Sequence, residues 1–219
     1  MLGKGLLLRE QNLITEYVNM VGLTVAQVSP RKDVVWRFAV LDSNVVNAFA
    51  APGGYIFITK GLLFLLKDEA QLAGVLAHEI AHVTARQVVN EIQKSRLAQA
   101  AIPGYVKATA EKAEWMSQIT DLAIQMIWKG LSREDELEAD KLGVGYVSAI
   151  GYDPVSFREV LESLKSRAQS PDSAKELKFL LSTHPKPEDR IASLEDRLKA
   201  LPPGGVKLEG RFKKSVKAG

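Results

Sequence analysis

Residues His78-Glu79-Ile80-Ala81-His82 read H-E-x-x-H and lie inside a helical pattern that predicts one helix over Glu69–Gln93. Residues four apart project from the same face of an α-helix, so the two imidazoles can share one zinc ion. Glu79 lies one step round the helix, where its carboxylate can take a proton from a water on that zinc. A chance pattern, or a satisfied polar patch, is the alternative interpretation.

The sequence around this pentad indicates where its helix begins and how it packs. Asp68 predicts the N-cap, and Gln71 completes a capping-box pattern. A stripe of small residues four apart either lets another backbone approach a buried metal site or reflects the high helix propensity of alanine: Ala73, Ala77, Ala81 and Ala85.

The composition limits the possible chemistry. The chain has 219 residues, 46% of them hydrophobic and 25% charged, which is typical of a soluble globular protein with a sizeable core. It has no cysteine, which excludes disulfides, thiolate zinc ligands and a cysteine nucleophile. A metal must therefore be held by histidines and carboxylates. No internal repeat or linker divides the chain, so residues 1–201 are predicted to form a single domain.

The net charge of +3 is unevenly distributed. Residues 202–219 carry five cationic side chains against Glu209 alone, which leaves the rest of the chain close to neutral. We therefore expect a basic, flexible C-terminal tail and no nucleic-acid-binding face. No apolar run approaches the roughly 20 residues of a membrane span, and the apolar stretch near Met1 is too short for a signal peptide. The protein is therefore either cytoplasmic or exported with its leader absent from this chain.

The chain before the pentad predicts a helix and a small sheet. Apolar residues at spacings of three and four predict a helix over Glu10–Val28. Three β-rich segments separated by turn residues, Val34–Leu41, Val45–Ala50 and Tyr55–Thr59, predict a small antiparallel sheet. Together with the helices that follow, this indicates an α+β fold that is mainly helical.

The chain after the pentad is predominantly helical. Within Lys94–Gly130 an amphipathic helix is expected over Trp115–Ile127, either as core packing or as a lid or membrane-surface patch. Further helices are predicted over Ser132–Ala149, after an Asp153 cap with Pro154 in the first position, over Lys175–Ser182, and from Pro187 to about Leu198.

A third metal ligand can come from Glu136-Leu137-Glu138-Ala139-Asp140. Glu136 and Asp140 are four apart, so one carboxylate can bind the metal while the other accepts the free N–H of a zinc-bound histidine. The spacing does not decide which does which, and Glu138 on another face is the weaker candidate. An exposed acidic helix face is the alternative interpretation.

HEIAH followed by ELEAD, 54 positions beyond His82, resembles the HtpX-like family of gluzincin metallopeptidases, which includes CAAX prenyl proteases and periplasmic BepA-type proteins. The resemblance extends to NAFAAPGGYIFITKGLL before the pentad and STHPKPEDRI after the acidic motif. It implies a zincin-like (minigluzincin) domain with one zinc ion, Glu136 as the third ligand, and Asp140 beside the ligands. It also implies that the edge strand of the sheet lies along the substrate cleft. This chain lacks the membrane spans and the repeat domains of those two branches, so neither supplies its substrate.

The motif STHPKPEDRI adds two candidates. His184 precedes a proline, where a histidine is usually a capping or packing residue, but the resemblance favours a role in the site. It would either stabilise the oxyanion or occupy the open zinc position in a resting state. Arg190 is expected to anchor that loop by pairing with a carboxylate.

These patterns predict a zinc peptidase in which Glu79 is the general base on a zinc-bound water. An extended or misfolded polypeptide would add a strand at the substrate-binding residues Asn47, Ala48, Phe49 and Ala50. A non-cleaving, chaperone-like module with His184 on the zinc is the second hypothesis, and hydrolysis of a non-peptide bond is a third. Soluble relatives of this kind are mostly exported, which favours a periplasmic or other extracytoplasmic location over the cytoplasm.

Overall fold

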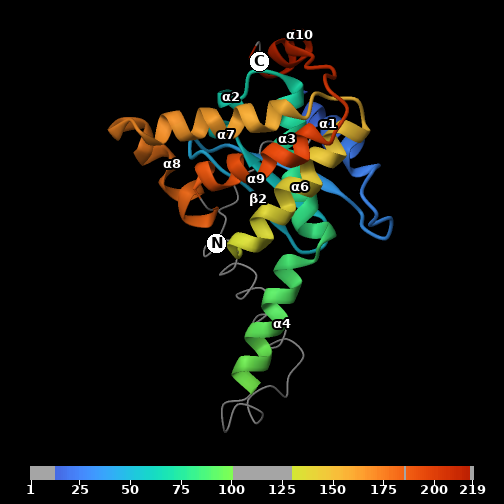
Figure 1. Cartoon of the computed structure of the whole chain (residues 1–219), viewed down its shortest axis with the longest axis vertical. Helices are drawn as coiled ribbons and strands as arrows, with labels where there is room; N and C mark the ends of the chain where they lie inside the picture. Colours follow the sequence, from blue (N-terminus) through green and yellow to red (C-terminus); the bar gives the residue numbers. More distant parts are fainter. Residues whose placement is uncertain (1–12, 101–129, 185, 218–219) are drawn as a thin grey trace.

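A helix, a small sheet and then a series of helices follow one another along the chain (Figure 1). The structure is a computed structural model that describes residues 13–100, 130–184 and 186–217. Its elements are α1 (Leu13–Ala26), β1 (Arg37–Leu41), β2 (Ala48–Ala51), β3 (Tyr55–Thr59), α2 (Lys60–Leu65), α3 (Glu69–Thr84), α4 (Gln87–Ala100), α6 (Arg133–Ala149), α7 (Val155–Ala168), α8 (Pro171–Thr183), α9 (Pro187–Lys199), α10 (Glu209–Phe212) and a π-helical turn, Lys213–Lys217. The prediction of a mainly helical fold with a small sheet is confirmed. Among the described helices, none is both long and apolar enough to cross a bilayer.

Helix α3, which carries the pentad, is the centre of this arrangement. Every residue from Glu69 to His82 is buried, because α1, α6, α7 and the sheet surround it (Figure 1). Its N-cap is the predicted one: the Asp68 carboxylate accepts a hydrogen bond from Gln71 N at 2.8 Å. A helix packed on every side has little freedom to shift, so it holds its side chains in fixed positions.

The sheet is mixed, and the prediction of an antiparallel sheet is wrong for one of its two pairs. The strand order is β1-β3-β2; β2 runs antiparallel to β3, but β1 runs parallel to it. The loop after β1 carries the chain to the far edge before β2 and β3 form a hairpin. Side-chain alternation is the same for both directions of pairing, so the sequence pattern could not separate them. The order leaves β2 as an edge strand.

The pentad helix is shorter than predicted. Instead of one helix over Glu69–Gln93, α3 ends at Thr84, and α4 begins at Gln87 and runs to Ala100. At the break, Arg86 has a positive φ of 57°, which is uncommon for a residue other than glycine. Neither glycine nor proline marks this position, so the sequence carried no sign of the break. The predicted helix around Trp115, with its lid interpretation, lies outside the described residues.

The later helices lie close to their predicted positions. Helix α7 starts one residue later than expected, at Val155, whose backbone N–H donates to the Asp153 carboxylate at 3.0 Å. Helix α8 is longer than predicted and begins at Pro171, and α9 begins at Pro187 as predicted. The short α2 was not predicted from the sequence.

The C-terminal residues pack against the body, so the prediction of a flexible tail is wrong for residues 206–216. Phe212 and Val216, four apart, are 0% and 1% exposed. The Lys207 carbonyl accepts hydrogen bonds from the first N–H groups of α3, at 3.0 Å from Glu69 N and 3.3 Å from Ala70 N. The prediction of a flexible tail relied on the charges of this segment and did not consider its two apolar residues. The division of the chain into one domain and a tail stays a prediction.

Arg211 connects this C-terminal segment to the start of α3. Its guanidinium forms a two-point ion pair with Glu69, which is fully buried and also accepts hydrogen bonds from Tyr17, at 2.6 Å, and Tyr152. The substitution Arg211→Met leaves the buried Glu69 carboxylate without its cation. We therefore expect it to lower the free energy of unfolding by about 2 kcal/mol. Urea denaturation measures it. Lys213→Met, which removes an exposed cation two residues away, should change it by less than about 0.5 kcal/mol.

Candidate active site

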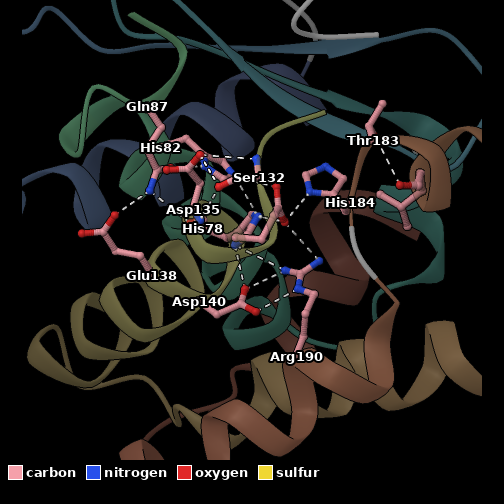
Figure 2. A network of polar contacts seen from close by, with 12 residues as sticks. His78, His82, Gln87, Ser132, Asp135, Glu138, Asp140, Thr183, His184 and Arg190 are labelled. Carbon is pink, nitrogen blue, oxygen red and sulfur yellow. Dashed lines mark hydrogen bonds and ion pairs between the residues drawn. The ribbon is translucent and has the colours of Figure 1, made fainter. Parts of the chain in front are cut away.

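The predicted metal ligands lie together where α3, α6 and the connection from α8 to α9 meet (Figure 2). His78 and His82 come from α3, Glu136 from α6, and His184 from the C-terminal end of α8. One ligand atom of each of these four residues lies within 4.8 Å of those of the other three. The structure therefore brings together both halves of the motif and adds the third histidine.

Close packing of α6 on α3 makes this possible. A Cβ added to Gly143 would lie 3.1 Å from the backbone N of His78 and 3.3 Å from the carbonyl carbon of Ala77. The start of α6 is held by a capping box in which Ser132 and Asp135 exchange hydrogen bonds. The two helices therefore approach each other at small residues, and Glu136 is held in the first turn of α6, facing the histidines.

Asp140 and Arg190 hold the first histidine. His78 Nδ1 lies 2.8 Å from the Asp140 carboxylate, which also accepts two hydrogen bonds from Arg190, at 2.6 and 2.8 Å (Figure 2). The side chains of Asp140 and Arg190 are both buried. The spacing of the acidic motif left the roles of Glu136 and Asp140 open; the structure places Asp140 on Nδ1 and Glu136 against Nε2, at 3.4 Å. The expected pairing of Arg190 with a carboxylate is confirmed.

Gln87, which sequence reasoning missed, holds the second histidine. Its Nε2 donates to the Asp135 carbonyl at 3.0 Å and to the Glu138 carboxylate at 2.8 Å, so its Oε1 must face His82 Nδ1, at 2.6 Å. An amide oxygen only accepts, which makes His82 Nδ1 the protonated nitrogen. Glu138 therefore acts through Gln87 and does not join the cluster. Only the unpredicted break between α3 and α4 brings Gln87 back to His82.

The orientation of both rings fits a cation. Each Nδ1 faces its acceptor, so the two Nε2 atoms turn towards each other and lie 3.0 Å apart, in a hydrogen bond that a bound cation would replace. Zinc–nitrogen bonds of about 2.0–2.1 Å at a tetrahedral angle separate two nitrogens by about 3.3 Å, close to this spacing. Glu136 lies 3.4 Å from His78 Nε2 and 3.5 Å from His82 Nε2. Two imidazoles and one carboxylate thus surround a position that a metal ion could occupy.

The electrostatics of the cluster favour ionised carboxylates. Burial and the Arg190 guanidinium lower the pKa of His78, but hydrogen bonds to Asp140 and Glu136 outweigh them and raise it to about 9. Burial raises the pKa of Glu136, but His184 and His78 hold it well below its usual range. Burial likewise raises the pKa of Asp140, yet Arg190 holds it low. The two carboxylates are therefore charged and ready to act as acceptor and ligand.

Glu79 is the uncommitted carboxylate of the site. It is 2% exposed, and it makes no hydrogen bond or ion pair with another described residue. It lines a cavity of about 30 Å³ together with His82, Glu136 and His184. A cavity of this size that has polar side chains in its wall can hold a water molecule. Glu79 is therefore placed to interact with a molecule that occupies the cavity.

The edge strand β2 reaches the same cavity, which Phe49 and Ala50 line. The Asn47 carbonyl accepts from Thr59 N at 3.0 Å, so Asn47 turns its main chain towards β3. Because main-chain direction alternates along an antiparallel pair, Phe49 also faces β3, and Ala48 and Ala50 face the free edge. Two of the four predicted substrate-binding residues, Phe49 and Ala50, thus line the cavity, and the main-chain groups of Ala48 and Ala50 lie on the edge away from β3.

Replacing Gln87 by Leu, which has a similar volume, should weaken zinc binding about 10- to 100-fold, because His82 loses the acceptor that fixes its tautomer and orientation. Competition with a chromophoric chelator measures the affinity. Gln93→Leu, on an exposed position of α4, is the matched control and should bind zinc as the unchanged chain does. Equal affinities in the two variants would show that Gln87 does not position the ligand.

Comparisons with known proteins agree with this geometry. Residues 11–198 match the model of Peptidase family M48. The chain is 27% identical over 207 residues to the beta-barrel assembly-enhancing protease of Escherichia coli (strain K12), with 91% of this chain and 42% of that protein covered. It is 33% identical over 196 residues to the mitochondrial metalloendopeptidase OMA1 of Schizosaccharomyces pombe, with 89% of this chain and 55% of that protein covered.

The extent of these matches decides what they show. The chain spans about two fifths of the length of the beta-barrel assembly-enhancing proteases and about half of the OMA1 protein. The family model, however, covers most of the chain, including the pentad, the acidic motif and His184. The chain therefore belongs to peptidase family M48.

Proposed function

We propose that this chain binds one zinc ion through His78, His82 and Glu136 and hydrolyses peptide bonds in extended or misfolded protein segments. The observation that carries the proposal is Glu79: a buried carboxylate with no hydrogen-bond or ion-pair partner among the described residues, beside three candidate ligands and the edge strand β2. Such a group, within reach of a polarised water, is what metal-assisted hydrolysis requires.

Each residue of the site has a separate role in the proposed reaction. When bound, zinc supplies a Lewis acid that polarises the attacking water and the scissile carbonyl. Glu79 accepts the proton of the water and then delivers it to the leaving nitrogen. Asp140, fixed by Arg190, keeps His78 in the tautomer that directs Nε2 to the metal, and Gln87 does the same for His82.

His184 is proposed to stabilise the oxyanion. Its ring lines the same cavity as Glu79, and its Nδ1 is 2.8 Å from the Glu136 carboxylate. A ring that donates from Nδ1 to a ligand carboxylate carries positive charge when its other nitrogen is protonated, and it would favour the charge that develops on the carbonyl oxygen.

The substrate is proposed to bind as an added strand on β2. Ala48 and Ala50 have main-chain groups on the free edge, and Ala50 borders the cavity that holds Glu79. Main-chain hydrogen bonds of this kind are largely independent of side chains, which suits extended or unfolded segments. An edge strand with unpaired N–H and C=O groups is a natural acceptor for such a segment.

One observation favours a second candidate, a non-cleaving binding module. His184 lies close enough to the other three residues to act as a fourth ligand, and a zinc ion with four protein ligands has no open position for water. X-ray absorption on the zinc-loaded chain distinguishes the two: three nitrogen ligands and one carboxylate indicate the closed form, and two nitrogens with additional oxygen indicate the open one.

Digestion of casein and of a peptide library tests the proposal. The zinc-loaded chain should cut both, a chelator should stop cutting, and added zinc should restore it. Because zinc is proposed to polarise both the attacking water and the scissile carbonyl, chelation is expected to lower the rate of hydrolysis by more than about 1,000-fold. Zinc-loaded chain that binds casein without cutting it would contradict the peptidase proposal and support the binding module.

Biological setting is also a proposal, since the chain spans less than half of some relatives. The name of one group of relatives refers to the enhancement of beta-barrel assembly, and the name of another describes a mitochondrial metalloendopeptidase. We infer a role in protein quality control in an extracytoplasmic compartment, the periplasm in a bacterium. Fractionation of the source cells tests it, and recovery in the cytoplasm would contradict it.

A further inference from the structure

A second, larger cavity adjoins the first at the end of β2. Its volume is about 300 Å³, and it shares Ala50, His82 and Val88 with the smaller cavity at Glu79. Its walls come from the β2–β3 turn, from the loop after α1, and from the break between α3 and α4. A polypeptide bound along β2 would therefore pass from the site directly into this cavity.

The walls combine apolar surface with positive charge. Most lining side chains are small or aliphatic, and the two permanently charged residues among them are Arg31 and Arg86. Arg31 is a fixed part of the wall, because it forms two hydrogen bonds of 2.8 Å with Asp33 and one of 3.3 Å with the Val83 carbonyl. Asp33 thus neutralises Arg31, and no carboxylate lines the cavity among the residues that the structure describes.

Arg86 differs from Arg31. Its side chain is exposed, and its guanidinium forms no hydrogen bond or ion pair with any other residue in the described ranges. Its φ of 57° lies in the left-handed region, at a position after a helix C-cap that glycine or asparagine usually occupies. An unfavourable backbone conformation that retains a large cationic side chain is a reason to look for a function of that side chain.

We propose that this cavity binds an acidic side chain of the polypeptide substrate and that Arg86 is the residue that selects it. The inference rests on the proposed peptidase function and names one feature of its substrate. Successive residues of an extended strand advance by about 3.3 Å, so the acidic residue should lie within about three positions of the cleaved bond. The aliphatic walls accommodate the methylene groups of the side chain, while the Arg86 guanidinium attracts its carboxylate.

Matched peptides test the inference in two ways. In pairs that differ only by Glu or Gln at one position, cleavage by the zinc-loaded chain is compared through kcat/KM. Binding to the non-cleaving Glu79→Gln chain is compared through fluorescence anisotropy. At one position near the cleaved bond, the Glu peptide should be preferred about fivefold in both measurements, and the preference should weaken as salt screens the charges.

Three variants identify the residue responsible. Arg86→Asn suits the left-handed backbone and removes the charge. The ratio of kcat/KM for the Glu peptide to that for the Gln peptide should therefore fall to about one, and the melting temperature should be unchanged or higher. Arg86→Lys keeps the charge and should keep most of the preference. Arg167→Asn removes a cation of α7 that lines neither cavity and should leave the preference as it was.

Equal treatment of Glu and Gln peptides at every position would overturn the inference and leave the peptidase function standing. So would a preference that survives in Arg86→Asn. If the zinc-loaded chain cuts nothing, the peptidase function is wrong; the binding measurement then decides separately whether Arg86 selects acidic segments.

Discussion

Glu79→Gln is expected to lower kcat for peptide hydrolysis by about 1,000- to 10,000-fold while zinc stays bound. The amide has the shape of the carboxylate but cannot accept a proton, so the step assigned to Glu79 is lost. The substitution should be tolerated structurally, because the side chain has no hydrogen-bond partner among the described residues to lose. Peptide kinetics, zinc content per chain and the melting temperature measure the three parts of this result.

The control removes a carboxylate of the same type from the surface. Glu162→Gln, on α7, alters a half-exposed side chain that is paired with Arg158 on its own helix, and it should retain full activity. Full activity in Glu79→Gln would exclude Glu79 as the base. Loss of zinc together with activity would instead make Glu79 a metal ligand, which is a different site from the one proposed.

The parts of the site that follow helical spacing could be predicted from the sequence. Residues four apart lie on the same face of a helix whatever surrounds the helix. Local structure therefore decides that His78 and His82 share one face of α3 and that Glu136 and Asp140 share one face of α6. Their encounter across two helices is not local. It depends on the close approach of Gly143 to Ala77. One interpretation of the alanine stripe predicts such an approach, but the stripe does not identify the helix that makes it.

The parts that depend on long-range contacts could not be predicted. Gln87 reaches His82 only because the helix breaks at Arg86, and the break is stabilised by contacts to α6 rather than by a residue that stops helices. The C-terminal residues were assigned to a flexible tail from their charge, whereas their order comes from Phe212 and the buried Glu69. In both cases the deciding partner lies tens of residues away in the chain.

Glu136→Gln is expected to weaken zinc binding more than about 100-fold, a larger effect than the loss of a residue that only orients a ligand. The amide keeps the volume but loses the charge that faces both Nε2 atoms at 3.4 and 3.5 Å. Hydrolysis should disappear at limiting zinc and return in part when zinc is in excess. Zinc titration by calorimetry and peptide kinetics at several zinc concentrations measure the two effects. Glu134→Gln, in the exposed first turn of the same helix, is the matched control and should change neither.

The same variant separates the two candidate functions. If His184 is outside the coordination sphere, Glu136→Gln leaves two histidines, which hold zinc weakly, and adding His184→Ala should change the affinity little. If His184 is a ligand, three imidazoles remain in Glu136→Gln, and zinc should dissociate only when His184 is also replaced. A Glu136→Gln chain that binds zinc as tightly as the unchanged chain would show that Glu136 is not a ligand. The ion would then belong to the three histidines alone, and the acidic motif would contribute only Asp140 on His78.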